Sequence, residues 1–393
     1  MFDRKEIRLL TLLTLVHFGL IVDFMIVMPL GPQLMRIFGI EPHQFSWLVS
    51  GYTLSAGTMG IIASLFLDFV NKRRALIFFL LGFAVSNFVC GIIRNFEMLV
   101  FARCLMGLFG GVVGSLIFSI TSDRFEVERR SSAFGIVMTA HALAAILGLP
   151  ICLFLATKFS WQTPFLLLAT FSLIMVLVIT RFLPEVFETV SQSKVKLPSL
   201  TRNQIFALLF MSLLVLGHFS INPFLFPSVI ANAKVDESQL PTIYLVCGVV
   251  SIVASILFGW LSDRYGKKKI FTLALLLSII PIYFVTNMKV LPFTLILTFV
   301  SLFFIVMTAR MIPAMSLVTT LVSLEGRTSF LSLIASVQQL SAALAAYLSG
   351  LLVTKSASGH LLGFEKVGYI AVLFSATAFV VSFKLKPIEG NDL

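Results

Sequence analysis

Of the 393 residues in this chain, 58% are hydrophobic and 12% are charged, about half the charged fraction of roughly 25% that is usual in soluble domains. This composition excludes an ordinary soluble globular protein. The net charge of +11 does not indicate nucleic-acid binding, because the basic residues lie in short loops between apolar runs and not on one amphipathic face.

Runs of about 20 apolar residues, the length that crosses a bilayer as a helix, follow one another along the chain. The sequence predicts twelve such helices, at residues 9–30, 46–67, 75–94, 97–120, 132–156, 162–183, 204–230, 240–262, 269–287, 292–317, 328–353 and 366–385. Arg4, Lys5 and Arg8 precede the first run as in a signal peptide, but no small-residue cleavage site follows. We therefore expect a retained first helix.

The loops differ in charge on the two sides of the predicted membrane. Clusters of Lys and Arg lie on the side of the N-terminus, whereas the opposite loops carry isolated bases. The positive-inside rule then places both termini in the cytoplasm. We expect a monomeric, multi-pass protein of a bacterial inner membrane, with the lipid bilayer as its surroundings.

A polar segment divides the chain into halves that repeat each other. We predict an N-terminal six-helix bundle at 1–183, a cytoplasmic linker at 184–202 and a C-terminal six-helix bundle at 203–393. The pattern of an acid followed by three bases occurs after the second predicted span and again after the eighth. Parallel repeats with a binding site at their interface are known in secondary transporters. The predicted fold is an all-α membrane protein with two pseudo-symmetric bundles.

Asp23 is a lone carboxylate near the middle of the first run. A charge in hydrocarbon costs roughly 2.5–3.5 kcal/mol and is kept mainly where it lines a pathway or takes up protons. Arg103 in the fourth span lies at a similar depth, so an ion pair between them can offset the cost of burying both. The alternative for Arg103 is an arginine that reaches the outer interface.

Three histidines, His17, His141 and His218, each stand alone on an apolar span. A satisfied hydrogen bond within the bundle is the simpler interpretation for each of them. His141 is the best exception, because Gln338 occupies the matching place in the eleventh span. Polar groups at these paired positions would flank a central cavity.

Two more polar residues are candidates for that cavity. Asn222, followed by Pro227, occupies a place in the seventh span like that of Asp23 and Pro29 in the first. Arg310, past the midplane of the tenth span, has no obvious acid partner in the sequence. It is expected either to contact an anionic substrate or to reach the cytoplasmic interface.

The eighth span ends in a motif of glycines and charges. Gly259 would let a neighbouring helix approach closely, and Asp263 would face the positive N-terminus of another helix. Arg264 follows, Gly266 makes the turn, and Lys267 begins a run of three lysines that holds the loop in the cytoplasm.

At these residues the sequence resembles the major facilitator superfamily, whose loop signature is Gly-x-Leu-x-Asp-Arg-x-Gly-Arg/Lys-Arg/Lys. The N-terminal copy keeps Asp68 and Lys72 but has Ser64 and Asn71 in place of the glycines. The segment 102–111, around Arg103, looks like the family's Arg-Gly motif of the fourth helix. The segment 310–314 is similar to its tenth helix.

A second set of matches points to bacterial drug:proton antiporters and arabinose-efflux-type permeases. Gly148-Leu149-Pro150, with residues 161–165, looks like the end of their fifth helix and the start of their sixth. The usual Gly-Pro-x-x-Gly-Gly of the antiporters is absent, which weakens that assignment, although Pro150 still offers a kink. The resemblance also implies a cytoplasmic latch formed by Asp68, Lys72 and Asp123.

The fourth span carries a stripe of glycines on the face of Arg103. Gly107, Gly110 and Gly114 recur at helical spacing. Small residues in such a stripe let another helix approach closely in a membrane. We expect these glycines, together with Gly148 and Pro150, to serve helix packing.

The residues and the resemblance favour proton-coupled export of a small amphiphilic compound by alternating access. Protonation of Asp23 would weaken its pairing with Arg103 and change the balance of states. Proton-coupled uptake of a metabolite, and a non-transporting sensor or lipid-handling protein, are the alternatives. No phosphate-binding loop, metal-ligand cluster or nucleophile elbow occurs in the sequence, so we expect no cofactor, no metal and no enzyme.

Overall fold

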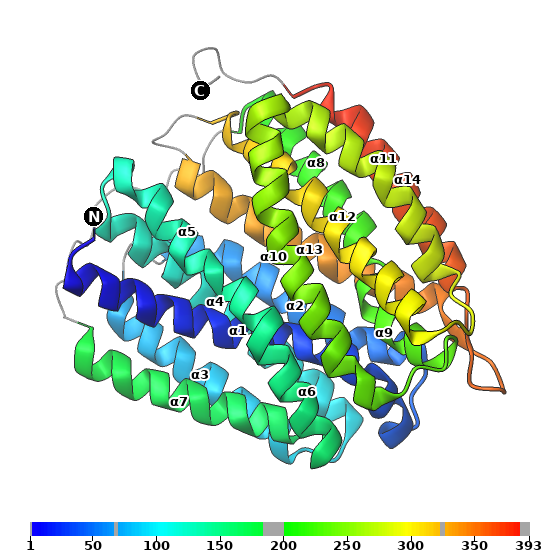
Figure 1. Ribbon diagram of the computed structural model, residues 1–393. Helices are drawn as coiled ribbons and strands as arrows, with labels where there is room; N and C mark the ends of the chain where they lie inside the picture. The colour runs from blue at the N-terminus through cyan, green and yellow to red at the C-terminus, as the bar shows by residue number, and fades with distance from the viewer. Residues whose placement is uncertain (1, 67–69, 184–199, 323–326, 386–393) are drawn as a thin grey trace. The chain divides into compact units, whose positions relative to one another are not determined.

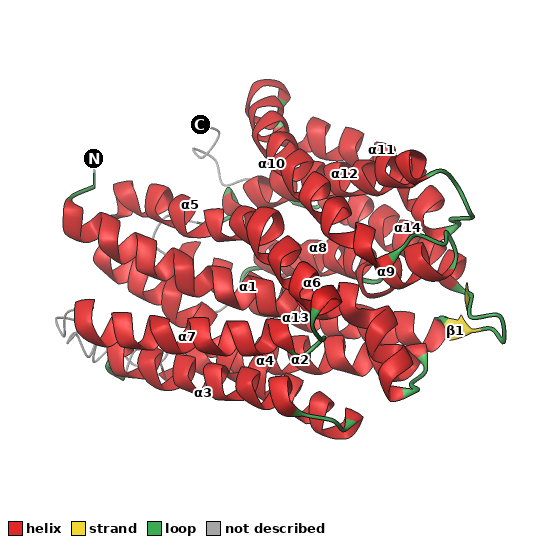
Figure 2. Ribbon diagram, turned by 60° about the horizontal axis from the view of Figure 1, so that its bottom comes forward, coloured by secondary structure: helices red, strands yellow, loops and turns green. Residues whose placement is uncertain are grey.

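The computed structural model describes residues 2–66, 70–183, 200–322 and 327–385, and these are nearly all helical (Figure 1). The helices are α1 (Arg4–Phe38), α2 (Pro42–Phe66), α3 (Lys72–Ile92), α4 (Phe96–Arg124), α5 (Val127–Leu143), η2 (Ala144–Gly148), α6 (Leu149–Lys158), α7 (Thr163–Phe182), α8 (Arg202–Phe219), α9 (Asn222–Ala231), η3 (Glu237–Gln239), α10 (Leu240–Tyr265), α11 (Lys267–Thr286), α12 (Phe293–Thr319), α13 (Arg327–Leu352) and α14 (Phe364–Ser382). Strand β1 (Thr354–Lys355) pairs antiparallel with β2 (Leu361–Leu362), and β1 is labelled in Figure 2.

Most of these helices are long and apolar enough to be membrane spans. Among the described residues, eleven helical segments are long and apolar enough to cross a membrane. Helix α2 is the remaining long helix and carries more polar residues, among them His43, Gln44 and Ser46. Each predicted span therefore corresponds to a helical segment, and the prediction of an all-α membrane protein is confirmed.

The chain forms two compact units. The first contains Met1–Val27 and Gly51–Pro198, and the second contains Met28–Ser50 and Ser199–Leu393. The end of α1 and the start of α2 thus group with the C-terminal helices. Two contacts within the second unit account for this grouping: Arg36 forms an ion pair with Glu237, and the Phe45 ring packs edge-on against Phe224. The division into six-helix bundles at 1–183 and 203–393 stays a prediction.

Helix neighbours within each unit follow from the apolar faces that they bury. In the first unit α3 packs against both α4 and α7, and Figure 1 shows α3 and α7 side by side. In the second unit α12 packs against α10 and α11, and α8 packs against α13 and α14. The contact of α12 with α11 holds one of the polar contacts described below, that of Arg310 with Ser278.

Two predicted spans are interrupted. The seventh is broken between α8 and α9, just before Pro223, which has no backbone N–H to continue the helix. The fifth contains the π-helical turn η2 next to Pro150, whose ring clashes with the carbonyl group four residues earlier in a regular helix. A π-turn of this kind is frequent at functional sites.

Candidate functional site

A buried ion pair joins α1 and α4 in the first unit. Nη1 of Arg103 lies 3.3 Å from each carboxylate oxygen of Asp23 and 3.3 Å from its backbone carbonyl oxygen. The Asp23 side chain has no exposed surface, and that of Arg103 is 1% exposed. Charge-assisted hydrogen bonds are commonly about 2.7–2.9 Å long, so this pair is loose. Arg103 does not reach an interface, and the snorkelling alternative is wrong.

Close packing of α4 on α2 positions Arg103. A Cβ atom at Gly107 would overlap the backbone carbonyl oxygen of Tyr52, and one at Gly111 would lie 2.8 Å from Cα of Ala56. Because the helices are this close, the Arg103 guanidinium lies over the Tyr52 ring, 4.4 Å from its centre. A ring face stabilises a cation, so Tyr52 helps to hold Arg103 in place.

The glycine stripe differs in part from the prediction. Gly107 packs against Tyr52 as expected, and a Cβ atom at Gly110 would lie 3.2 Å from the Tyr52 hydroxyl. No described atom lies within 4 Å of a Cβ atom at Gly114, so its predicted role in close packing is wrong. Gly111 takes that role, because the approach to α2 follows one side of α4.

Gly148 serves helix packing as expected. A Cβ atom there would overlap Val22 and crowd the ring of Phe18, both on α1. The turn η2, which ends at Gly148, therefore lies against the segment of α1 that carries Asp23.

His17 and His141 are neighbours in the first unit. Their ring centres are 5.3 Å apart, and the rings are inclined at 63°. His17 is buried, and neither of its ring nitrogens has a hydrogen-bond partner in the described part of the chain. The expected satisfied hydrogen bond is therefore wrong for His17. His141 is exposed.

Arg310 is fully buried within the second unit. Its Nη1 donates to Oγ of Ser278 on α11 at 3.4 Å and to Oγ of Ser375 on α14 at 2.9 Å. Its Nε and Nη2 have no hydrogen-bond partner within the described ranges. With no exposed surface, the side chain does not reach the cytoplasmic interface, so that alternative is wrong.

The break between α8 and α9 carries a second imidazole contact. Nδ2 of Asn222 lies 3.0 Å from Nε2 of His218, whose ring stacks on Phe303 at 6.1 Å. The expected hydrogen bond of His218 is thus present. Gln338 is half-buried on α13 in the second unit, whereas His141 belongs to the first. Their predicted pairing across a cavity stays a prediction.

The predicted cytoplasmic latch is described in part. Nζ of Lys72 forms an ion pair with Oδ2 of Asp123, whose side chain is 41% exposed. Asp68 lies outside the described residues. A neighbouring pair joins Nη2 of Arg129 to Oε2 of Glu6 at 2.7 Å, and this hydrogen bond raises the pKa of Arg129.

The glycine motif at the end of α10 forms an exposed corner of the second unit. Gly266 adopts a φ of +97°, a conformation that favours glycine, and it separates α10 from α11. The Arg264 guanidinium lies 5.1 Å from the Trp260 ring, and Asp263 and Lys267 sit beside the turn. No described atom lies within 4 Å of a Cβ atom at Gly259, so the predicted close packing there is wrong.

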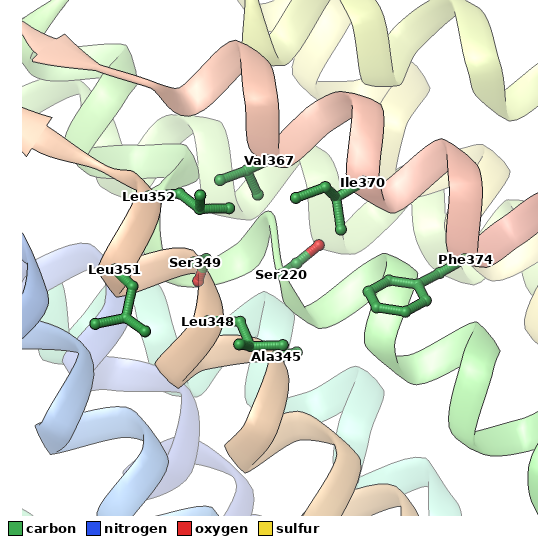
Figure 3. Close-up of a pocket in the computed structure, with 9 residues that line it drawn as sticks. All are labelled: Ser220, Ala345, Leu348, Ser349, Leu351, Leu352, Val367, Ile370 and Phe374. Carbon is green, nitrogen blue, oxygen red and sulfur yellow. The ribbon is translucent and has the colours of Figure 1, made fainter.

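An apolar pocket of about 220 Å³ lies where α8, α13 and α14 meet (Figure 3). Leu348 and Leu352 of α13 and Val367 and Phe374 of α14 line it, with Ser220 at the end of α8. None of the predicted site residues lines this pocket. Its chemistry suits an apolar group and offers no charge for recognition.

Comparison with known proteins places the chain in a family. A sequence model of the Major Facilitator Superfamily matches residues 13–229 and again residues 205–391. The chain belongs to the Major Facilitator Superfamily. The recognition made from its motifs is therefore confirmed.

Two relatives are similar over part of their length. The "Uncharacterized MFS-type transporter YceJ" of Bacillus subtilis (strain 168) is 28% identical over 65% of this chain and 66% of the relative. A "Probable sugar efflux transporter" of Mannheimia succiniciproducens is 28% identical over 55% of this chain and 53% of the relative. The chain thus covers less than two thirds of either. Both relatives are named as transporters and not as enzymes.

Solved structures share the fold at low identity. A bacterial homologue of the human lysosomal transporter Spinster, in an inward-facing and unoccupied conformation, aligns with a TM-score of 0.79, 15% identity and 98% coverage of both chains. A point mutant of the nucleoside transporter NupG aligns with a TM-score of 0.75 and 15% identity, covering 96% of this chain and 100% of that one. The chain is a multi-pass membrane protein with the major facilitator fold.

Three features of the site were not foreseen from the sequence. Tyr52 lies under Arg103, and Ser278 and Ser375 bind Arg310. Each is a polar group within an apolar span, which is a usable signal in a membrane protein. The contact between His17 and His141 has no such signal, because it depends on how α1 and α5 pack.

Proposed function

We propose that this chain is a secondary active transporter that exports a small amphiphilic organic compound in exchange for protons. Family membership supports transport, and the name of the "Probable sugar efflux transporter" supports export. The observation that carries the proton coupling is the buried pair of Asp23 and Arg103.

The pair couples proton uptake to conformation through its charge. While Asp23 is ionised, the attraction of Arg103 holds α1 against α4. A proton on the carboxylate removes that attraction and leaves the guanidinium with the Tyr52 ring and the Asp23 carbonyl oxygen. Each conformation then has a different affinity for the proton, which is the thermodynamic requirement for coupling.

The pair must open to water during the cycle. Asp23 has no exposed surface in this conformation, so proton exchange requires a second state in which α1 and α4 present it to the cavity. Alternating access supplies such a state, because the two repeats rock about a site near the midplane.

Substrate recognition is assigned to polar groups on cavity-facing helices. We assign Arg310, Asn222, His141 and Gln338 to the cavity between the repeats, with Arg310 contacting an anionic group of the compound. The ion pair of Lys72 and Asp123 serves as the latch. Such a half-exposed pair contributes little free energy, and a latch needs only a small bias between two states.

The membrane orientation belongs to the same proposal. Loop charge supports both termini in the cytoplasm and insertion into a bacterial inner membrane. A fluorescent protein fused to the C-terminus, which fluoresces only when it folds in the cytoplasm, checks this orientation. A dark but full-length fusion would contradict it.

Inside-out membrane vesicles test the function and its direction. With an acidic lumen, an exporter that exchanges protons accumulates its compound inside the vesicles. The probes are ethidium as a cation, radiolabelled arabinose as a neutral sugar and fluorescein as an anion. We expect accumulation of at least one probe, abolished by nigericin. Loss of a preloaded probe from the lumen would indicate proton-driven uptake into the cell and would overturn export.

A further inference from the structure

Two imidazole rings are in edge contact within the first unit. His17 projects from α1 and His141 from α5, with ring centres 5.3 Å apart. A ring nitrogen lies about 1.2 Å from the ring centre, so two rings joined by an N–H···N bond of about 2.9 Å have centres about 5.3 Å apart. The observed separation is compatible with a histidine–histidine hydrogen bond.

In this conformation the two rings are not oriented to form that hydrogen bond. The rings are inclined at 63°, and both nitrogens of His17 are buried without a partner among the described residues. The χ2 torsion of histidine has a broad energy profile, so a ring turns at little cost. A buried polar atom without a partner costs about 1–3 kcal/mol, which favours the turn.

The surroundings of His17 leave His141 as its titratable neighbour. Helix α4 contributes the Phe118 ring at 5.6 Å, and Thr14 on α1 bonds to the Leu10 and Ile136 carbonyl groups. Of the titratable side chains, His141 is the one whose ring contacts that of His17 in the described part of the chain. Asp23 follows six residues later on α1, about 9 Å along the helix and on another face.

We propose that His17 and His141 hold one proton between them and form a second proton site in the first unit. Neither ring nitrogen of His17 has a partner among the described residues, so both are available to bond to the neighbouring His141 ring. One added proton makes an imidazolium that donates to an imidazole, and such a charge-assisted bond is about twice as strong as a neutral one. A second proton removes the acceptor and adds repulsion, so the pair binds one proton only.

The pair is linked to the Asp23 segment through α1 and through the turn η2 that follows α5. His141 is exposed, whereas His17 is buried on the helix that carries Asp23. The turn η2 begins at Ala144, one turn after His141, and its Gly148 lies against Val22. A shift of α5 against α1 therefore changes the ring contact and the surroundings of Asp23 together. This role in coupling rests on the proposed function, but the shared proton itself does not.

Selective ¹⁵N labelling of histidine in the purified full-length protein, held in lipid nanodiscs, tests the shared proton. The chain has five histidines, so the spectrum is sparse. Between about pH 4 and pH 9, we expect the His17 and His141 signals to move in one common step, each by about half the shift of a fully protonated imidazole. Two independent steps of full amplitude, or no movement of either signal, would overturn the proposal.

Variants assign the signals and separate the two proposals. His141→Gln removes an exposed side chain, so the fold is retained, and the remaining His17 signal is expected to lose the common step. His360→Gln, in the segment that leads to β2, is the matched control and is expected to remove only its own signal. Asp23→Asn is expected to leave the common step in place. Loss of coupling in Asp23→Asn therefore tests Asp23, and the histidine spectrum tests the pair.

Discussion

At the scale of single residues, the two buried arginines differ in their partners. Arg103 has the Asp23 carboxylate and the Tyr52 ring, whereas Arg310 has two serine hydroxyl groups and, within the described residues, no carboxylate. Removing one partner of a buried ion pair costs more than replacing the whole pair by neutral groups. Each arginine therefore makes a different prediction for stability.

Arg103→Gln is expected to lower the free energy of unfolding by about 3–5 kcal/mol, because it leaves the Asp23 carboxylate buried without a cation. Proton uptake by Asp23 at low pH reduces this loss. The double variant Asp23→Asn with Arg103→Gln is expected to recover most of it. Thermal unfolding of the purified protein, followed by tryptophan fluorescence, measures the double-mutant cycle. Losses that simply add would show that the two side chains do not interact.

Arg310→Met is expected to keep or raise the unfolding temperature, because an apolar side chain of similar length needs no counter-ion in this interior. The same variant is expected to lose transport of the anionic probe if Arg310 binds substrate. Arg310→Lys keeps the charge and serves as the control for transport. A large drop in the unfolding temperature of Arg310→Met would show that the serine contacts stabilise the fold.

At the scale of elements, the approach of α4 to α2 positions the ion pair. The glycines that allow it, Gly107 and Gly111, face the backbone of α2, whereas no described atom lies close to a Cβ atom at Gly114. Small residues at such a contact let two helix backbones pack closely. The geometry of the ion pair therefore depends on the lack of a Cβ atom at Gly107 and Gly111 as well as on the charged side chains.

Gly107→Ala is expected to destabilise the protein by about 1–3 kcal/mol, because the added methyl group overlaps a backbone carbonyl that cannot move aside. Gly114→Ala is the matched control on the same helix. It is expected to be neutral or to stabilise by up to about 1 kcal/mol through helix propensity. Thermal unfolding compares the two variants. Equal effects would contradict the close contact between α4 and α2.

The membrane spans could be predicted because the length of each apolar run is enough to identify a span. Three details could not be predicted from the sequence, each for a physical reason. Helix α1 runs on to Phe38 through Pro29 and Pro32, although proline usually ends a helix. The break before Asn222 depends on Pro223 within an apolar run that otherwise reads as continuous. Which glycines touch α2 depends on the rotation of α4, which hydropathy does not encode.

At the scale of the whole molecule, the family could be recognised because short sequence patterns identify its loop motif and its repeats. The site could be predicted residue by residue for Asp23 and Arg103, whose cost in hydrocarbon makes them conspicuous. The contact of His17 with His141 required coordinates, since neither sequence position points to the other. The compact units also group Met28–Ser50 with the C-terminal helices, which no local pattern indicated.

Coupling of proton movement to substrate movement is a property of the whole molecule. In this account it depends on one side chain, that of Asp23. In proteoliposomes loaded with a probe that the wild type transports, two assays separate coupling from movement of the protein. Accumulation driven by a pH gradient requires a titrating group. Exchange of probe for probe at equal pH requires only that the two repeats rock.

Asp23→Asn in these proteoliposomes is the most direct measurement. The amide keeps the size and polarity of the side chain but cannot take up the coupling proton. We predict that accumulation driven by the pH gradient is lost while equal-pH exchange continues. Accumulation at the wild-type level in Asp23→Asn would contradict the assignment of Asp23 as the proton carrier.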